Sequence, residues 1–238
     1  SRRLEAEVRA KSEATVEGIV QLLQMSDSLM GQQTHSAMKL FQEKSRQSGP
    51  PGAAEAVGVG NSRPNNLHFG SRSMALDTAL VDNVSAIAGG SATLFAREGK
   101  RYIRIATNVR SSDNQRAVGT ELDPQGKAYQ ALERGEPFYG QVDILGAPHL
   151  TGYEPIVDAS GNRVGAWYVG FKADLAGLKE LIGKSRSFGS GFVVLLDAKG
   201  QPFLQSSDAS ARTIRSALEA VAKGSDGWAL VERPFPAW

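Results

Sequence analysis

The stretch "FYGQVDILGAPHLTGYEPIVDASGNRVGAWYVGF" (138–171) predicts three β-strands, because runs of β-branched and aromatic residues are separated by turn residues. The last two strands meet at "DASG" (158–161), a loop suited to a type I turn closed by glycine. Connections this short join antiparallel neighbours. The stretch therefore predicts an antiparallel meander.

Polar side chains in this meander are unusual for a solvated strand face, where Lys, Glu and Thr are common. Strand alternation places His149, Thr151 and Tyr153 on one face of the second strand. We expect Tyr139 of the first strand to converge on the same side. A buried hydroxyl donor without a partner costs about 1–3 kcal/mol. The group therefore predicts either an internal hydrogen-bond network or a ligand that completes it.

The stretch "SATLFAREGKRYIRIATNV" (91–109) predicts a hairpin that turns at Glu98-Gly99. Alternation places the isoleucines of its second strand on one face, which we expect to pack against the long N-terminal helix. Arg104 lies on the other face, beside the small Ala106. A guanidinium there can hold a carboxylate through two parallel hydrogen bonds. A structural ion pair is the alternative.

The stretch "DPQGKAYQALERG" (123–135) predicts a short helix, with Asp123 as its N-cap and Gly135 as its C-cap. Arg116 and Lys127 flank the start of this helix. Free backbone N–H groups at a helix start favour an anion. We include both cations in the candidate site, although Lys127 can equally be plain surface charge.

The N-terminal residues predict a long helix, because residues 3–44 contain no proline and repeat apolar residues at helical spacing. Such a helix is about 60 Å long. A stretch rich in proline and glycine breaks it from residue 49 on, and a second helix is expected near residues 75–84.

After the meander the pattern partly restarts. It predicts a connecting helix, a hairpin that turns at "DAKG", another helix and the start of a strand: 174–186, 191–206, 212–224 and 227–238. The sequence thus predicts an α+β fold, in which a long N-terminal helix packs on an antiparallel sheet of about five strands and a partial second module follows. The predicted domains are 1–48, 49–174 and 175–238.

Composition excludes several classes of function. The 238 residues carry 27 Lys and Arg against 25 Asp and Glu, a balance that gives no nucleic-acid signal. There is no cysteine, and the three histidines lack metal-ligand spacing. No "GxSxG" elbow is present, and "GVGNSR" (58–63) fails the dinucleotide fingerprint. We therefore expect no enzyme, metal or cofactor. A small hydrolase stays the alternative, since acidic residues lie close to His149 in the sequence.

Three stretches carry a family resemblance: "YIRIATNV" (102–109), the run from Arg116 to Phe171, and "GSGFVVLLDAKG" (189–200). They resemble the Cache sensor family, the extracytoplasmic ligand-binding regions of bacterial chemoreceptors, sensor kinases and diguanylate cyclases. The later residues are similar to the start of the second module in the Cache fusion arrangement. The resemblance implies a PAS-like pocket, a membrane-leading N-terminal helix and flanking transmembrane segments outside this chain.

Together these inferences predict the periplasmic or extracellular part of an inner-membrane receptor, foremost a methyl-accepting chemotaxis receptor. Its expected ligand is a two- to four-carbon carboxylate. The expected ligand-binding residues are Arg104, Tyr153, Tyr139, His149, Thr151, Arg116 and Lys127. The alternatives are the sensor region of a histidine kinase or cyclase, and an amino acid or amine as ligand. The expected partners are the ligand, the membrane and a second copy bound through the N-terminal helix, with no nucleic acid.

Overall fold

The computed structural model describes residues 2–144, 147–173, 193–196, 201–205 and 210–222, together with Gly177, Glu180, Ile182 and Gly183. Contacts divide the chain into two compact units. One unit is formed mainly by Ser28–Ala173, and the other combines Ser1–Asp27 with described residues after position 173. Each unit is described by itself below.

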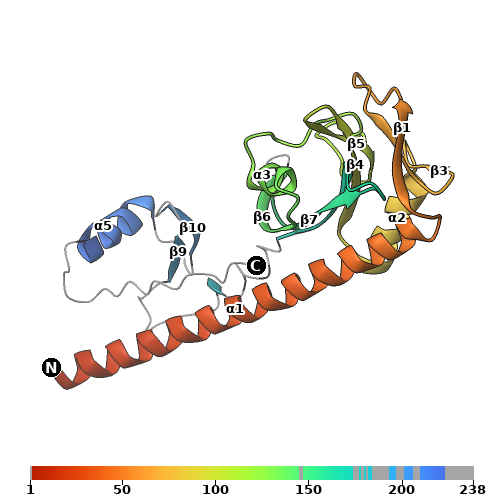
Figure 1. Ribbon diagram of the computed structural model, residues 1–238. Coiled ribbons are helices and arrows are strands. Elements are labelled where there is room, and N and C mark those ends of the chain that lie inside the picture. The colour runs from red at the N-terminus through yellow and green to blue at the C-terminus, as the bar shows by residue number, and fades with distance from the viewer. Residues whose placement is uncertain are drawn as a thin grey trace. The chain divides into compact units, whose positions relative to one another are not determined.

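The Ser28–Ala173 unit is built around a five-stranded antiparallel sheet of order β5-β4-β8-β7-β6 (Figure 1). Its strands are β4 (Ser91–Glu98), β5 (Arg101–Thr107), β6 (Phe138–Ile144), β7 (Ala147–Val157) and β8 (Arg163–Lys172). The predicted hairpin and meander are both confirmed. The hairpin turns at Gly99, whose φ of 61° is a backbone conformation that glycine adopts without strain.

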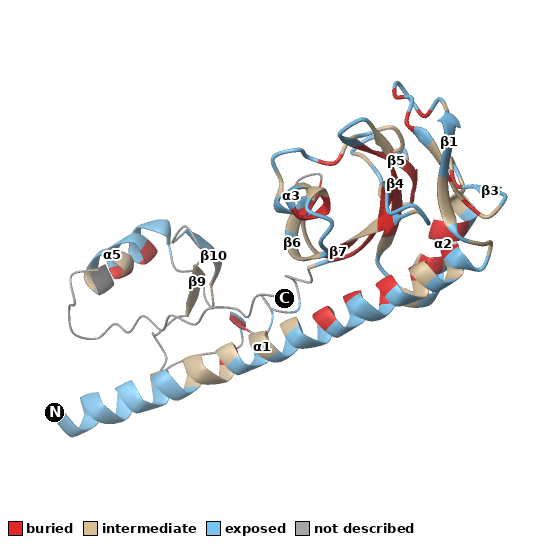
Figure 2. Cartoon of the chain, in the orientation of Figure 1, coloured by how far each residue is buried: buried red, intermediate tan, exposed pale blue. Residues whose placement is uncertain are grey.

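Two helices cover one face of this sheet. α1 (Arg2–Arg46) confirms the predicted long helix, and its second half carries a row of buried residues (Figure 2). α2 (Thr78–Ala88) begins three residues later than predicted. The reason is local, since the Asp77 side chain accepts a hydrogen bond from the Leu80 N–H and so caps the helix.

A three-stranded sheet lies between these two helices in the sequence: β1 (Pro51–Ala56), β2 (Asn65–Phe69) and β3 (Arg72–Ser73). The sequence predicted only that the N-terminal helix ends here, because proline and glycine are frequent. Leu67 and Phe69 of β2 are fully buried and tie this sheet to the main core.

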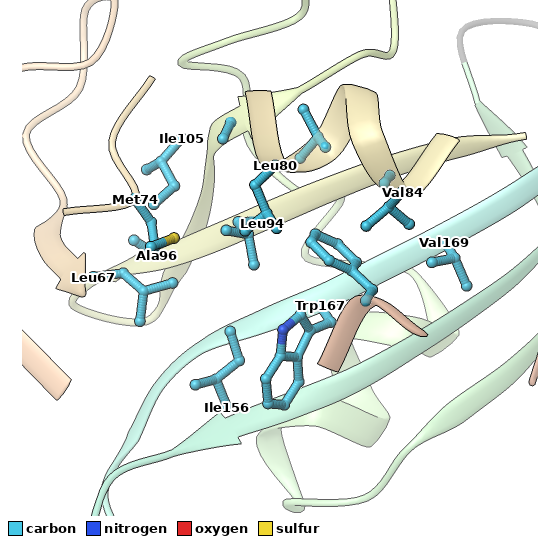
Figure 3. Packing of buried hydrophobic residues seen from close by; sticks show 14 of the residues in the cluster. Leu67, Met74, Leu80, Val84, Leu94, Ala96, Ile105, Ile156, Trp167 and Val169 are labelled. Carbon is cyan, nitrogen blue, oxygen red and sulfur yellow. The ribbon is translucent and has the colours of Figure 1, made fainter. Parts of the chain in front are cut away.

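The main core lies where α1, α2 and β2 meet the five-stranded sheet (Figure 3). Phe41 of α1 and Trp167 of β8 are among its largest buried side chains. The Trp167 indole donates a hydrogen bond to the Ser45 hydroxyl of α1, at 3.1 Å. Ile105 belongs to this cluster, as expected for the isoleucines of β5.

A second cluster covers the opposite sheet face, beneath α3 (Lys127–Glu133). The prediction that Asp123 caps this helix is wrong, because residues 123–126 form a turn in which the Gly126 N–H bonds the Asp123 carbonyl. Gly126 is the N-cap. The C-cap is Arg134 and not Gly135 as predicted; Gly135 follows it, with φ of 75° and its N–H bonded to the Leu132 carbonyl.

In the other unit, β9 (Val194–Leu196) pairs antiparallel with β10 (Pro202–Gln205), and α5 (Ala211–Ala222) follows. These elements confirm the predicted second hairpin and its helix. The "DAKG" turn, the final strand and most of the connecting helix lie outside the described residues. The predicted domain boundaries stay a prediction.

Candidate ligand-binding site

The sheet face beneath α3 carries a group of aromatic side chains and one arginine. Register places Tyr153 of β7 opposite Tyr168 of β8, and Phe95 of β4 opposite Arg104 of β5. The Tyr153 and Tyr168 rings lie 5.0 Å apart between centroids. The guanidinium of Arg104 lies 5.0 Å from the Phe95 ring centroid. Arg104 and Tyr153 therefore lie on the same face, as the sequence predicted.

Arg104 is partly buried and makes few contacts with the protein. Its Nη1 donates to the Thr120 hydroxyl at 3.0 Å and to the Glu121 carbonyl at 3.1 Å. No carboxylate contacts it within the described residues, and its Nε and Nη2 donate to none of them. Burial lowers the pKa of Arg104, which shows that its charge is poorly solvated.

The phenols beside Arg104 are buried and protonated. Tyr153 is only 1% exposed, and its hydroxyl finds no hydrogen-bond partner in the described part of the chain. Burial raises the pKa of Tyr153 far above the ordinary value for tyrosine, and raises that of Tyr168 to about 12. The Tyr168 hydroxyl shares a 3.1 Å hydrogen bond with Ser91. Both phenols are thus neutral donors at physiological pH.

Thr151 and His149 lie on the same face of β7 as Tyr153, by strand alternation. Thr151 is buried, and its hydroxyl donates to the Gly140 carbonyl of β6 at 2.7 Å. This bond makes Thr151 a link between two strands. His149 is half-buried near the end of β7.

The expected convergence of Tyr139 is wrong. Tyr139 pairs with Gly152, so it faces α1 and packs against the main core. Its ring lies 3.8 Å from the His35 ring, and its hydroxyl donates to Glu154 at 2.8 Å. The side-chain amide of Gln42 of α1 donates to the same carboxylate. Tyr139 therefore connects the sheet to α1 instead of joining the Arg104 group.

The two cations near α3 do not join the Arg104 group either. Arg116 makes a bidentate ion pair with Asp82 of α2, at 2.7 and 2.8 Å. Lys127 is the exposed first residue of the seven-residue α3. The expected role of Arg116 is thus replaced by the structural ion pair, and Lys127 lies at the surface.

The Asp82–Arg116 pair gives a pH-dependent prediction. The hydrogen bond from Arg116 lowers the pKa of Asp82 below its ordinary value of 3.8. The unfolded chain therefore binds the proton more readily, and the pair stabilises the fold above pH 3.8. Because the carboxylate is 45% exposed, the gain is screened to about 0.5 kcal/mol.

We therefore expect Asp82→Asn to lower the free energy of unfolding by this amount at pH 7. The difference from the wild type disappears as pH falls through the lowered pKa. Urea unfolding at several pH values measures it, with the exposed Glu55→Gln as control. A difference that grows on acidification contradicts the assignment.

The sequence missed Tyr168 as a member of this group. It lies in the run "AWYVGF", which reads as a buried strand with no polar role. The "DASG" turn alone did not reveal it, because a bulge in β8 shifts the register by one residue before Tyr168 comes opposite Tyr153. Within the described residues, no group of three or more His, Cys, Asp or Glu can hold a metal. None of the helices described here is both long and apolar enough to span a bilayer.

These features define a class: an α+β domain with a PAS-like antiparallel sheet and polar side chains beneath a short helix. The chain belongs to the Cache 3/Cache 2 fusion domain family, whose sequence model matches residues 1–223. No curated protein matches the sequence significantly.

Solved structures agree with this family. The sensory domain of the Campylobacter jejuni chemoreceptor Tlp3 (CcmL) aligns with a TM-score of 0.50 at 10% identity, over 92% of this chain and 84% of that chain. The same sensory domain with isoleucine bound gives 0.48 at 10% identity, over 90% and 81%. The Vibrio cholerae histidine kinase DctB sensor domain gives 0.38 at 16%, over 60% and 55%.

At these identities the likeness shows the fold alone. Family and fold together point to a sensory ligand-binding domain and not to a catalytic one. Cache sensor domains of chemoreceptors are extracytoplasmic.

Proposed function

We propose that the Ser28–Ala173 unit binds a small organic acid of two to four carbons between its sheet and α3. The observation that carries this proposal is Arg104, a desolvated cation without a carboxylate partner in the described residues. A charge withdrawn from water without compensation is costly. A carboxylate ligand removes that cost.

The geometry of the guanidinium favours a carboxylate over other anions of similar size. Nε and Nη2 form the edge that binds the two oxygens of a carboxylate in parallel. The protonated Tyr153 hydroxyl adds a third donor. The aromatic rings around it, Phe95 and Tyr168 among them, provide an apolar surface for a short carbon chain.

The size of the ligand limits its affinity. The best very small ligands gain about −1.5 kcal/mol per heavy atom. A four-atom acid therefore reaches about −6 kcal/mol, which is a dissociation constant on the order of tens of micromolar. This range suits a sensor that follows a nutrient concentration.

The proposal places this domain in a receptor of the inner membrane, foremost a chemoreceptor, with a histidine kinase or cyclase as the alternative. We also propose that two copies associate through the N-terminal helix α1. The support is a row of exposed apolar residues at heptad spacing, Leu22, Met25 and Leu29.

A thermal-shift screen tests the ligand class. We expect acetate, propionate and pyruvate to raise the melting temperature, whereas the matched amides acetamide and propionamide do not, because they lack the negative charge. At a ligand concentration of 100 times the dissociation constant, the stabilisation is about 2.7 kcal/mol.

Alanine and ethylamine complete the screen. Stabilisation by ethylamine, which has no carboxylate, contradicts the carboxylate assignment, and stabilisation by alanine alone favours an amino acid as the ligand. Conversion of any compound during incubation, followed by proton NMR, supports the hydrolase alternative instead.

A further inference from the structure

A concavity of about 340 Å³ lies at the β7–β8 turn, away from the Arg104 group. Arg97 of β4, Gly161 and Asn162 of the turn, and Arg163 of β8 line it. No hydrogen bond or ion pair joins these lining residues to Arg104, Tyr153 or Tyr168 within the described part of the chain. Two arginines at one hollow, with no carboxylate among its lining residues, raise the question of what neutralises them.

A β-bulge brings the second arginine there. In the β7–β8 ladder Ile156 pairs with Gly165 but Val157 pairs with Arg163, so that Val164 is an extra residue. Val164 is buried in the main core beside α1. The bulge therefore turns Arg163 to the opposite face, where its charge acts on Tyr102.

The two arginines differ in their protein contacts. Arg97 Nη1 donates to Glu133 of α3 at 2.7 Å and to the Tyr102 hydroxyl at 3.0 Å, and its Nε donates to the Gly99 carbonyl. Its Nη2 makes no such bond. Arg163 is half-buried, its Nε is inaccessible and unbonded, and its guanidinium donates to no described residue.

One of the two guanidinium groups at the hollow, that of Arg163, has no ion-pair partner among the described residues. Glu133 offsets one of the two guanidinium groups. The nearby Asp158 carboxylate accepts hydrogen bonds from the backbone of Ser160 and from both the backbone and the side chain of Asn162. These bonds lower the pKa of Asp158 and engage its oxygens within the turn.

We propose that this hollow binds a tetrahedral oxyanion of the phosphate or sulfate type. The donors that remain available, Nη2 of Arg97 and the two terminal nitrogens of Arg163, belong to two strands. An anion with oxygens in several directions can meet both, whereas the two oxygens of a monocarboxylate suit a single guanidinium. The site is separate from the proposed carboxylate site and does not depend on it.

Titration of the whole chain with inorganic phosphate, at constant ionic strength and followed by calorimetry, tests this site. We expect saturable binding with a dissociation constant on the order of 1 mM, since the hollow is open to water. Arg163→Gln should weaken it at least about tenfold. Arg163→Lys keeps the charge but loses the planar guanidinium. Its phosphate affinity should lie between that of the wild type and that of Arg163→Gln.

The matched control is Arg63→Gln, which removes the same charge from an exposed side chain of another region. It should leave phosphate affinity unchanged, as should Arg104→Met. Sulfate should compete with phosphate, and acetate should not. Titrations without saturation overturn the proposal, and so does equal weakening by Arg163→Gln and Arg63→Gln. If Arg163→Gln does not fold, wild-type phosphate affinity in Arg163→Lys overturns the proposal instead.

Discussion

Arg104→Met should weaken carboxylate binding at least about 30-fold. The variant keeps the length of the side chain but removes the charge and the Nε–Nη2 edge that faces the ligand. A lost pair of charge-assisted hydrogen bonds in a desolvated site costs about 2–5 kcal/mol. Since each tenfold change in affinity corresponds to about 1.4 kcal/mol, a loss of about 30-fold to several thousandfold follows.

The same substitution should leave the free energy of unfolding within about 1 kcal/mol of the wild type, or raise it. The variant loses two hydrogen bonds to neutral acceptors and the contact with the Phe95 ring. The variant also avoids the free-energy cost of desolvating an unpaired guanidinium, and this offsets the lost contacts. Loss of binding combined with unchanged stability distinguishes a ligand contact from a structural one.

Calorimetry with the best acid of the screen and urea unfolding measure both effects. Arg116→Met is the matched control, because it removes the same charge from an arginine paired with Asp82. It should lower the free energy of unfolding slightly and leave the carboxylate affinity within about twofold of the wild type. Wild-type affinity in Arg104→Met places the ligand elsewhere, and unfolding of that variant means that Arg104 serves the fold.

The strands of the main sheet could be predicted from the sequence, but the sheet face on which each side chain lies could not. The alternation along each strand is visible in the residues, whereas the register between β6 and β7 depends on the turn that joins them. Tyr139 pairs with Gly152 rather than with a residue on the face of Tyr153. A difference of one position therefore places the Tyr139 side chain on the α1 side.

A bulge also changed the face on which side chains lie within a single strand. In β5 the pairing moves from Leu94–Ala106 to Phe95–Arg104, so that Ile105 is extra. Ala106 then lies in the main core and not beside Arg104 as expected. A bulge adds one residue to one strand only, and no residue type in β5 marks its place.

The part of the site that could be predicted rests on side chains within one strand. Tyr153 and Thr151 share a face because they are two positions apart, and no register enters the argument. Ligand contacts across strands, such as Tyr168, need the turn geometry as well. The three strands between α1 and α2 escaped prediction because the glycines and prolines at the start of β1 and between the strands are typical of loops.

Phe41→Ala should lower the free energy of unfolding of the Ser28–Ala173 unit by about 3–5 kcal/mol. Phe41 is fully buried in the main core, and removal of a buried phenyl ring loses its transfer free energy and leaves a cavity. Its neighbourhood resists collapse, because the Ser45 hydroxyl bonds both the Phe41 carbonyl and the Trp167 indole. The gain in helix propensity from alanine, below about 1 kcal/mol, does not compensate.

Ile87→Ala is the matched control, since it removes an apolar side chain from α2 of the same unit at a position that is 59% exposed. It should change stability by no more than about 0.5 kcal/mol. Urea unfolding by far-ultraviolet circular dichroism measures both variants. Phe41 belongs to the core that attaches α1 to the sheet face opposite Arg104. A cost for Phe41→Ala equal to that of the control means that α1 is not held by this core.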